Sequence, residues 1–214
     1  MQTTIPFFPL EVVVFPGERL LLHVFEDRYK QLIDDCKVTG KAFGIPIFYK
    51  KNLKLGTEVT LEEVVKEYDN GEMDIICNAH RIFELKSFEN PLPGKMYSGG
   101  LVEFREIDRE AKREEKENVV VLINELYKNL GVLMDPIDTD SFNSFLFAHK
   151  IGLSLAQEYQ LLQIKTERQR LHFLRSHLKM VIPVVTQLNL TKERIQMNGH
   201  FKNFNELDFK DFKL

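Results

Sequence analysis

The stretch LEVVVFPGERLLLHVFEDRY, residues 10–29, carries the strongest structural signals in the sequence. Its valine-rich first half predicts a strand over Leu10–Phe15, and Pro16-Gly17 supplies a turn. A second strand is predicted over Leu20–Val24. The stretch then closes with a group of polar and aromatic side chains: His23, Glu26, Asp27, Arg28 and Tyr29. This group is open to two interpretations, an active site or the start of a helix.

A helix is predicted from Asp27 to the residue before Gly40. Four apolar residues in this range recur at the spacing of one helix face: Tyr29, Leu32, Ile33 and Cys36. A carboxylate at the first positions favours the positive end of the helix dipole. We therefore expect Glu26 or Asp27 to start the helix.

The polar residues around this helix start have a structural interpretation and a catalytic one. In the first, Arg28 pairs with a carboxylate, Tyr29 faces the core and His23 binds a backbone carbonyl. In the second, His23 is a general base oriented by Glu26 or Asp27. No serine or cysteine lies beside these residues in the sequence to act as nucleophile, so we favour the structural interpretation.

The rest of the first half, up to residue 107, is predicted to be rich in strands. Asp69-Asn70-Gly71 is a strong hairpin signal because Asn-Gly adopts positive φ at low cost. Pro46 predicts an edge or a bulge. The further strands are expected over Ala42–Tyr49, Thr57–Tyr68, Glu72–Phe88 and Tyr97–Arg105. One helix among many strands predicts an α+β or closed-barrel arrangement.

Residues 108–195 are predicted to form a small helical bundle. The charged run REAKREEKE, 109–117, is typical of a solvated first helical turn at a domain boundary, and helical spacing continues to Gly131. A second helix is expected to begin near Asp140 or Ser141. Capping-box patterns, Ser154-x-x-Gln157 and Thr166-x-x-Gln169, start the next two, and Pro183 is expected to kink or end the last.

The segment 196–214 forms a separate tail that is rich in phenylalanine. Four phenylalanines alternate there with polar and charged residues: Phe201, Phe204, Phe209 and Phe212. Exposing that much apolar surface to water is unfavourable, so we expect the tail to dock on the protein's own body rather than wait for a partner.

Composition limits the class of protein. The chain has 214 residues, a net charge of −3 and 43% hydrophobic residues, which predicts a globular protein without a global basic field. Its two cysteines are too few for a disulfide framework, and we see neither a signal peptide nor a membrane span. These features predict a cytoplasmic protein that does not contact a membrane.

Residues 5–36 resemble the start of the Lon protease N-terminal domain. The matching positions are Pro6, Phe8, Pro9, Leu10, Pro16, Gly17, Leu22, His23, Phe25, Glu26, Arg28 and Tyr29. Weaker similarity continues through Leu55-Gly56-Thr57 and His80-Arg81-Ile82-Phe83 to about residue 190. The resemblance implies a PUA-like mixed β pseudo-barrel with one inserted helix, followed by helices. In full-length Lon proteases, this region recognises substrate proteins.

The sequence argues against an enzyme. The Gly-Lys pairs, Gly40-Lys41 and Gly94-Lys95, lack the upstream glycine and following Ser or Thr of an ATP-binding loop. The Ser–Lys protease domain of Lon needs more chain than remains, which indicates a stand-alone, non-enzymatic protein. We expect no cofactor and no metal, because Cys77-x-x-His80 has no second half-site. A hydrolase that uses Cys36 or Cys77 is kept as a minor alternative.

One basic helix face is a candidate partner-binding site. Its members are Arg168, His172, Arg175 and Lys179. Such a face can contact phosphates or an acidic protein segment, although many are simply solvated.

We favour a module that binds unfolded or client polypeptides, as an adaptor for proteolysis or quality control. The alternative is an RNA-binding PUA-like protein. The acidic first half of the chain and the absence of tryptophan argue against RNA binding. The oligomeric state is left open.

Overall fold

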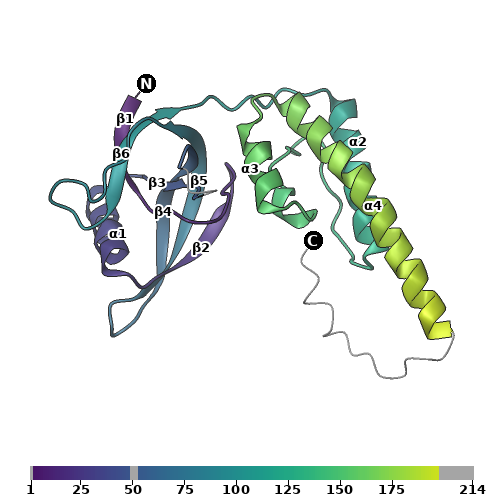
Figure 1. The fold of residues 1–214 in the computed structure, drawn as a ribbon, viewed down its shortest axis with the longest axis horizontal. Coiled ribbons are helices and arrows are strands. Elements are labelled where there is room, and N and C mark those ends of the chain that lie inside the picture. The colour runs from purple at the N-terminus through teal and green to yellow at the C-terminus, as the bar shows by residue number, and fades with distance from the viewer. Residues whose placement is uncertain (1, 49–52, 198–214) are drawn as a thin grey trace. The chain divides into compact units, whose positions relative to one another are not determined.

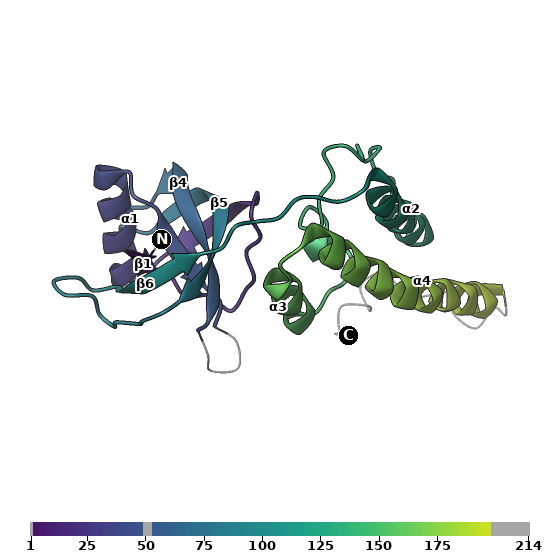
Figure 2. The ribbon, with the colours of Figure 1, turned by 90° about the horizontal axis from the view of Figure 1, so that it is seen from above.

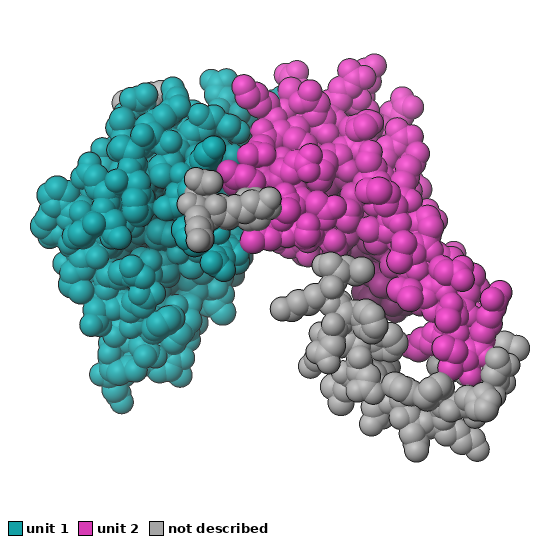
Figure 3. All heavy atoms as spheres, viewed as in Figure 1, with its two compact units in different colours: residues 1–108 teal, residues 109–214 magenta. Residues whose placement is uncertain are grey.

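The chain divides into two compact units, residues 1–108 and 109–214 (Figure 3). The structure is a computed structural model, and it describes residues 2–48 and 53–197. Unit 1 is a β-barrel with one helix, and unit 2 is helical (Figure 1). The protein therefore has the α+β class predicted from its sequence.

Six strands and one helix make up the described part of unit 1. They are β1 (Gln2–Phe7), β2 (Arg19–Val24), α1 (Asp27–Thr39), β3 (Phe43–Pro46), β4 (Leu55–Glu67), β5 (Met73–Leu85) and β6 (Ser98–Phe104). The strand order is β2-β5-β4-β3-β1-β6, and all pairs are antiparallel except β1–β3. An additional pairing of β5 with β6 closes the sheet into a barrel (Figure 2).

The barrel closes because β5 has two different neighbours along one of its sides. Its first part, Met73–Asn78, pairs with β2, and its last part, Phe83–Leu85, pairs with β6. Between the two, Ala79 exchanges backbone hydrogen bonds with Gly17 and Glu18 at 2.9 and 2.8 Å. The Pro16-Gly17 turn therefore fixes the point where the strand changes partners.

The barrel core lies between the sheet and α1. Helix α1 buries the four residues predicted from their spacing, and it ends at Gly40, which has a φ of 65°. The Phe8 and Tyr29 rings stack with centroids 3.9 Å apart. At Gly56, a Cβ atom would meet the Phe83 ring and lie 2.6 Å from the Ile45 carbonyl oxygen. A glycine is thus required at position 56 of β4 for close packing inside the barrel.

The long hairpin is confirmed, but two other predictions in unit 1 need correction. Strands β4 and β5 flank the turn at Gly71, which has a φ of 76°. The predicted strand Leu10–Phe15 was wrong, because this segment has only an isolated bridge from Leu10 to Ile47. Val13, Val14 and Phe15 are all buried in succession, so the segment lacks the alternation of a half-exposed strand. Strand β3 ends at Pro46, earlier than predicted.

Unit 2 consists, within the described residues, of α2 (Arg113–Asn129), a 3₁₀ helix (Ala148–Lys150), α3 (Leu155–Gln163) and α4 (Glu167–Met197). Helices α2 and α4 run side by side in the same direction (Figure 1). Arg168 pairs with Glu115 near their first turns at 2.7 Å, and Asn129 donates to Thr186 near the end of α2 at 3.1 Å. The α4 helix continues through Pro183, so of the two predicted effects of this proline, a kink or an end, the structure excludes the end.

The start of α3 follows the predicted capping box at Ser154 and Gln157. No α-helix begins near Asp140 or Ser141 among the described residues, contrary to prediction. Instead, Asn143 accepts a hydrogen bond from the Phe145 N–H, and Glu167 accepts from the N–H and hydroxyl of Ser144. These side-chain bonds occupy donors that a helix would use.

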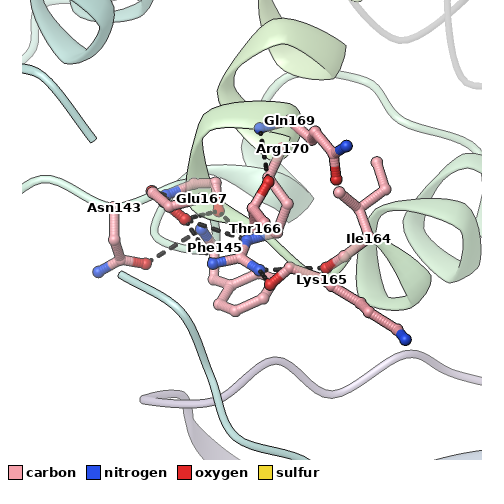
Figure 4. Close-up of polar contacts among 9 residues, drawn as sticks. Asn143, Phe145, Ile164, Lys165, Thr166, Glu167, Gln169 and Arg170 are labelled. Atoms are coloured by element: carbon pink, nitrogen blue, oxygen red, sulfur yellow. Dashed lines mark hydrogen bonds and ion pairs between the residues drawn. The ribbon is translucent and has the colours of Figure 1, made fainter. Parts of the chain in front are cut away.

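The Glu167 carboxylate belongs to a buried polar cluster at the start of α4 (Figure 4). Arg170 donates to Glu167 at 2.7 Å, to the Ser144 hydroxyl at 2.9 Å and to the Lys165 carbonyl at 2.9 Å. One arginine thus joins the first turn of α4 to the segment before it and to the turn region around residue 144.

Candidate functional site

Strand β2 has an open edge. It pairs with β5 from Arg19↔Asn78 to Val24↔Met73, and it is the first strand in the sheet order. No strand within residues 2–48 and 53–197 pairs with its other side. In an antiparallel pair, alternate residues direct their N–H and C=O groups away from the partner strand. The outer side of β2 therefore carries backbone groups that another extended chain can bind.

Two large apolar side chains lie exposed on or next to this strand. Leu21 is 68% exposed, and Phe25, which directly follows β2, is 58% exposed. In contrast, Leu20, Leu22 and Val24 pack into or against the barrel core. The alternation is that of a strand with one face in the core. The exposed apolar groups thus stand on the outer face, next to the open edge.

His23 lies between these two apolar residues on the same outer face. Its Nδ1 is 2.7 Å from Asp74 Oδ1, and its Nε2 is 3.3 Å from Glu72 Oε2. The hydrogen bond with Asp74 raises the pKa of His23, partly offset by desolvation, and it lowers the pKa of Asp74. The Tyr68 hydroxyl donates to the other Asp74 oxygen at 2.8 Å. His23 therefore binds carboxylates and not the backbone carbonyl that was expected.

The remaining motif residues around the helix start are arranged as the structural interpretation describes. Glu26 is the N-cap residue of α1, although its side chain makes no cap hydrogen bond. Arg28 pairs with Glu26 at 2.6 Å, and Tyr29 is buried. No serine, threonine or cysteine contacts His23 in the contacts described for it. Of this group, Tyr29 packs in the barrel core and Glu26 directly precedes α1.

Pro9, Pro16 and Gly17 shape the segment that leads into β2. Pro16 is buried, Pro9 is half-buried, and Gly17 has a φ of 95°. Gly17 is needed at this turn because L-residues rarely adopt such a φ. The motif residues thus lie in two places. Pro16 and Gly17 form the turn before β2, whereas His23 and Phe25 lie on the exposed side of β2.

Sequence reasoning missed Leu21 as a site residue. The only sequence signal for it is the alternation from Arg19 to Val24, which shows that one face of the strand is outward. That an outward leucine lies beside an unpaired strand edge depends on the sheet order, which is set by residues far along the chain.

The predicted basic face lies on α4, beside a cavity of about 220 Å³ between α2 and α4. The four predicted residues are exposed, and Arg168, His172 and Arg175 line the cavity together with Glu115, Asn118 and Leu171. Arg168 is neutralised by Glu115 at 2.7 Å. Arg175 and Lys179 have no ion-pair partner among the described residues. The accessible positive charge of this face therefore lies toward its second half.

A second cavity, of about 340 Å³, lies in unit 1 between α1, β1 and the loop before β6. Leu32, Leu92 and Pro93 supply apolar walls, and Asp35 accepts hydrogen bonds from Lys95 and Tyr97 at 2.6 Å each. These bonds lower the pKa of Asp35. Asp35, Lys95 and Tyr97 are thus already paired with one another.

Neither cysteine is placed as a nucleophile. Burial raises the pKa of Cys36 to about 11 and that of Cys77 to about 12, so both thiols stay protonated near neutral pH. Cys77 is buried, whereas His80 points outward and lies 2.7 Å from the Thr60 hydroxyl. Within the described ranges, no three His, Cys, Asp or Glu side chains converge in a way that could hold a metal.

Comparison with known proteins identifies the family. Residues 4–180 match the model of the ATP-dependent protease La (LON) substrate-binding domain. The chain belongs to this family. The match runs from within β1 through α3 and ends in the first half of α4. A comparison with curated protein sequences gives no significant match.

Two solved structures of Lon N-terminal domains have a similar fold. The Lon N-terminal domain protein from Xanthomonas campestris is 26% identical, with a TM-score of 0.63, over 81% of this chain and 98% of that chain. The N-terminal domain of the Mycobacterium avium complex Lon protease is 17% identical, with a TM-score of 0.59, over 83% of this chain and 98% of that one. Among the described residues, no helix has the length and apolar character needed to cross a bilayer.

Proposed function

We propose that this Lon-type domain is a polypeptide-recognition module that binds extended apolar segments of client proteins along the open edge of β2. The observation that carries the proposal is the unpaired side of β2 with Leu21 and Phe25 exposed beside it. Membership of a substrate-binding family supports the same class of partner.

An extended client chain would bind as an additional strand. The backbone hydrogen bonds of such an addition do not depend on the client's side chains, whereas alternate side chains supply selectivity. Burying Leu21 or Phe25 would contribute about 1.5–3 kcal/mol each. The backbone hydrogen bonds and the apolar burial together favour unfolded segments with alternating apolar residues.

Natural proteins usually protect edge strands, and the protection at β2 is incomplete. Charged side chains or prolines on an edge discourage pairing with other chains. Arg19 is such a charge, but it is engaged with Glu62 at 2.8 Å. No proline lies within β2. The centre of the edge, around Leu21, is therefore left available.

The proposed role is non-catalytic, as an adaptor that presents clients to a protease or to another quality-control factor. The protonated, buried state of both thiols and the structural role of the residues around Glu26 support it. We propose the basic face of α4, and mainly Arg175 and Lys179, as a second contact for acidic segments of a partner.

The test is capture of a labelled unfolded polypeptide by the full-length protein and its variants. The double variant Leu21→Asp/Phe25→Asp should weaken capture at least tenfold, because it places charge where apolar burial is required. Val38→Asp is the control, since Val38 is an 87% exposed apolar residue on α1 and does not belong to β2. Equal loss in the control, or no loss in the double variant, would contradict the proposal.

The same assay separates polypeptide binding from RNA binding. Phosphate contacts weaken steeply as salt rises, whereas apolar strand addition does not. Capture that survives nuclease and about 0.5 M salt, where the Debye length is roughly 4 Å instead of about 10 Å at 0.1 M, supports the module proposed here. Binding that nuclease or salt abolishes would favour the RNA alternative.

A further inference from the structure

The second half of α4 carries an apolar face that no described residue covers. Met180, Val184 and Leu188 follow one another at intervals of one helical turn, and they are 63%, 50% and 60% exposed. Ile195, two turns further along, is 42% exposed. We refer to these four residues as the α4 apolar face. Val181 and Val185, half-buried, lie along its border.

The first half of the same helix is different. There, the apolar residues Leu171, Leu174 and Leu178 are fully buried in unit 2. Helix α2 ends at Asn129, which contacts Thr186 and Asn189, so the last turns of α4 extend past it. A folded monomer seldom exposes a continuous row of large apolar side chains without a covering partner.

The chain itself supplies a segment of matching chemistry. Residues 198–214 lie outside the described residues, and they follow α4 directly in the sequence. They contain Phe201, Phe204, Phe209 and Phe212, together with Leu207 and Leu214. Six apolar side chains in so short a segment are enough to cover the four on the helix.

The segment also has the required reach. The distance along α4 from Ile195 back to Met180 is about 22 Å at 1.5 Å per residue. A chain of about 17 residues spans up to roughly 55–60 Å when extended. It can therefore turn back after Met197 and run beside the whole α4 apolar face. We propose that residues 198–214 fold back in this way and form an intramolecular cover.

Covalent attachment favours this occupant over a second copy of the chain. A tethered segment acts at an effective concentration in the millimolar range, which a free partner does not reach in ordinary solution. The inference is independent of the proposed function, because it concerns unit 2 and leaves β2 unchanged.

Hydrogen exchange in the full-length protein tests the proposal. In the variant with Phe201, Phe204, Phe209 and Phe212 changed to Ser, backbone amides of 180–195 should exchange at least tenfold faster, because the helix end loses its cover. The matched control changes Lys202, Asn203, Asn205 and Lys210 to Ser and keeps every phenylalanine. Its exchange should equal that of the unchanged protein. Equal exchange in both variants would overturn the proposal.

A spin label shows whether the cover comes from the same molecule. The variant Asn205→Cys can be labelled selectively, because Cys36 and Cys77 are buried. The label should broaden the methyl signals of Met180 and Leu188 in its own chain. If broadening instead appears only when spin-labelled and isotope-labelled chains are mixed, a second copy covers the face and the proposal is wrong.

Discussion

The Arg170 guanidinium and the Glu167 carboxylate form an ion pair with only 1% of either side chain exposed, and their Nη2–Oε2 distance is 2.7 Å. The pair holds the start of α4 to Ser144 and to two backbone carbonyls. A buried pair of this kind offers little net stabilisation over an apolar pair, but loss of one partner leaves a charge without compensation.

Arg170→Met should therefore lower the free energy of unfolding of unit 2 by about 3–5 kcal/mol. Urea denaturation followed by the far-ultraviolet helix signal measures this loss. The double variant Arg170→Met/Glu167→Leu should be less destabilised than the single one, because it buries no unpaired carboxylate. A double variant that loses more than the single one would show that the pair is not the source of the effect.

Gly56→Ala should destabilise the barrel by about 1–3 kcal/mol, which is the usual cost of overpacking a core. The added Cβ would meet the Phe83 ring and the Ile45 backbone inside the sheet. Thermal or denaturant unfolding measures the change. Val65→Ala on the same strand serves as the comparison, since Val65 is exposed and its truncation should have little effect. Similar losses in the two variants would argue against the packing explanation.

The His23–Asp74 contact should make stability depend on pH. Because the folded-state pKa of His23 is raised, its contribution is fully present below the ordinary value of 6.5 and is lost as pH rises through the folded-state pKa. Asp74→Asn should lower the His23 pKa, leaving only the smaller rise caused by Glu72, and flatten this part of the profile. Nuclear magnetic resonance titration of the His23 ring gives the pKa directly. A His23 pKa that is unchanged in the Asp74 variant would contradict this assignment.

On the basic face of α4, the change Arg175→Glu/Lys179→Glu should weaken capture of an acidic polypeptide several-fold and leave the melting temperature unchanged. Both side chains are exposed and without an ion-pair partner among the described residues. Arg168 is less suitable for this test because it also stabilises the α2–α4 contact through Glu115. Unchanged capture would remove this face from the binding surface.

Local signals explain which parts of the fold could be predicted from the sequence. The α1 helix has its apolar spacing and its stop at Gly40 within a few residues, and the β4–β5 hairpin has Asn70-Gly71 at its turn. The Leu10–Phe15 segment was assigned wrongly because its continuous burial depends on the barrel around it. Similarly, no local pattern reveals that Glu167 takes the backbone donor of Ser144 from 23 positions away.

The candidate site was predicted only in part for the same reason. The motif from Pro16 to Tyr29 predicts both the family and the start of a helix. The family match confirms the first, and the start of α1 at Asp27 confirms the second. That the exposed Leu21 lies beside an open strand edge becomes visible only from the sheet order, which leaves β2 at an edge. That order depends on β5 changing partners between β2 and β6. The Pro16-Gly17 turn marks the point of this change, but no short stretch of sequence shows that β6 is the second partner.

Binding of two N-methylated peptides tests the central claim, strand addition at β2, most directly. Both peptides have the same alternating apolar sequence, and their N-methyl groups occupy either the odd or the even positions. Each modification removes the backbone donors on one edge of the peptide only. The account predicts that one peptide binds the full-length protein like the unmodified one and that the other loses at least tenfold in affinity. Equal affinity of the two would contradict it.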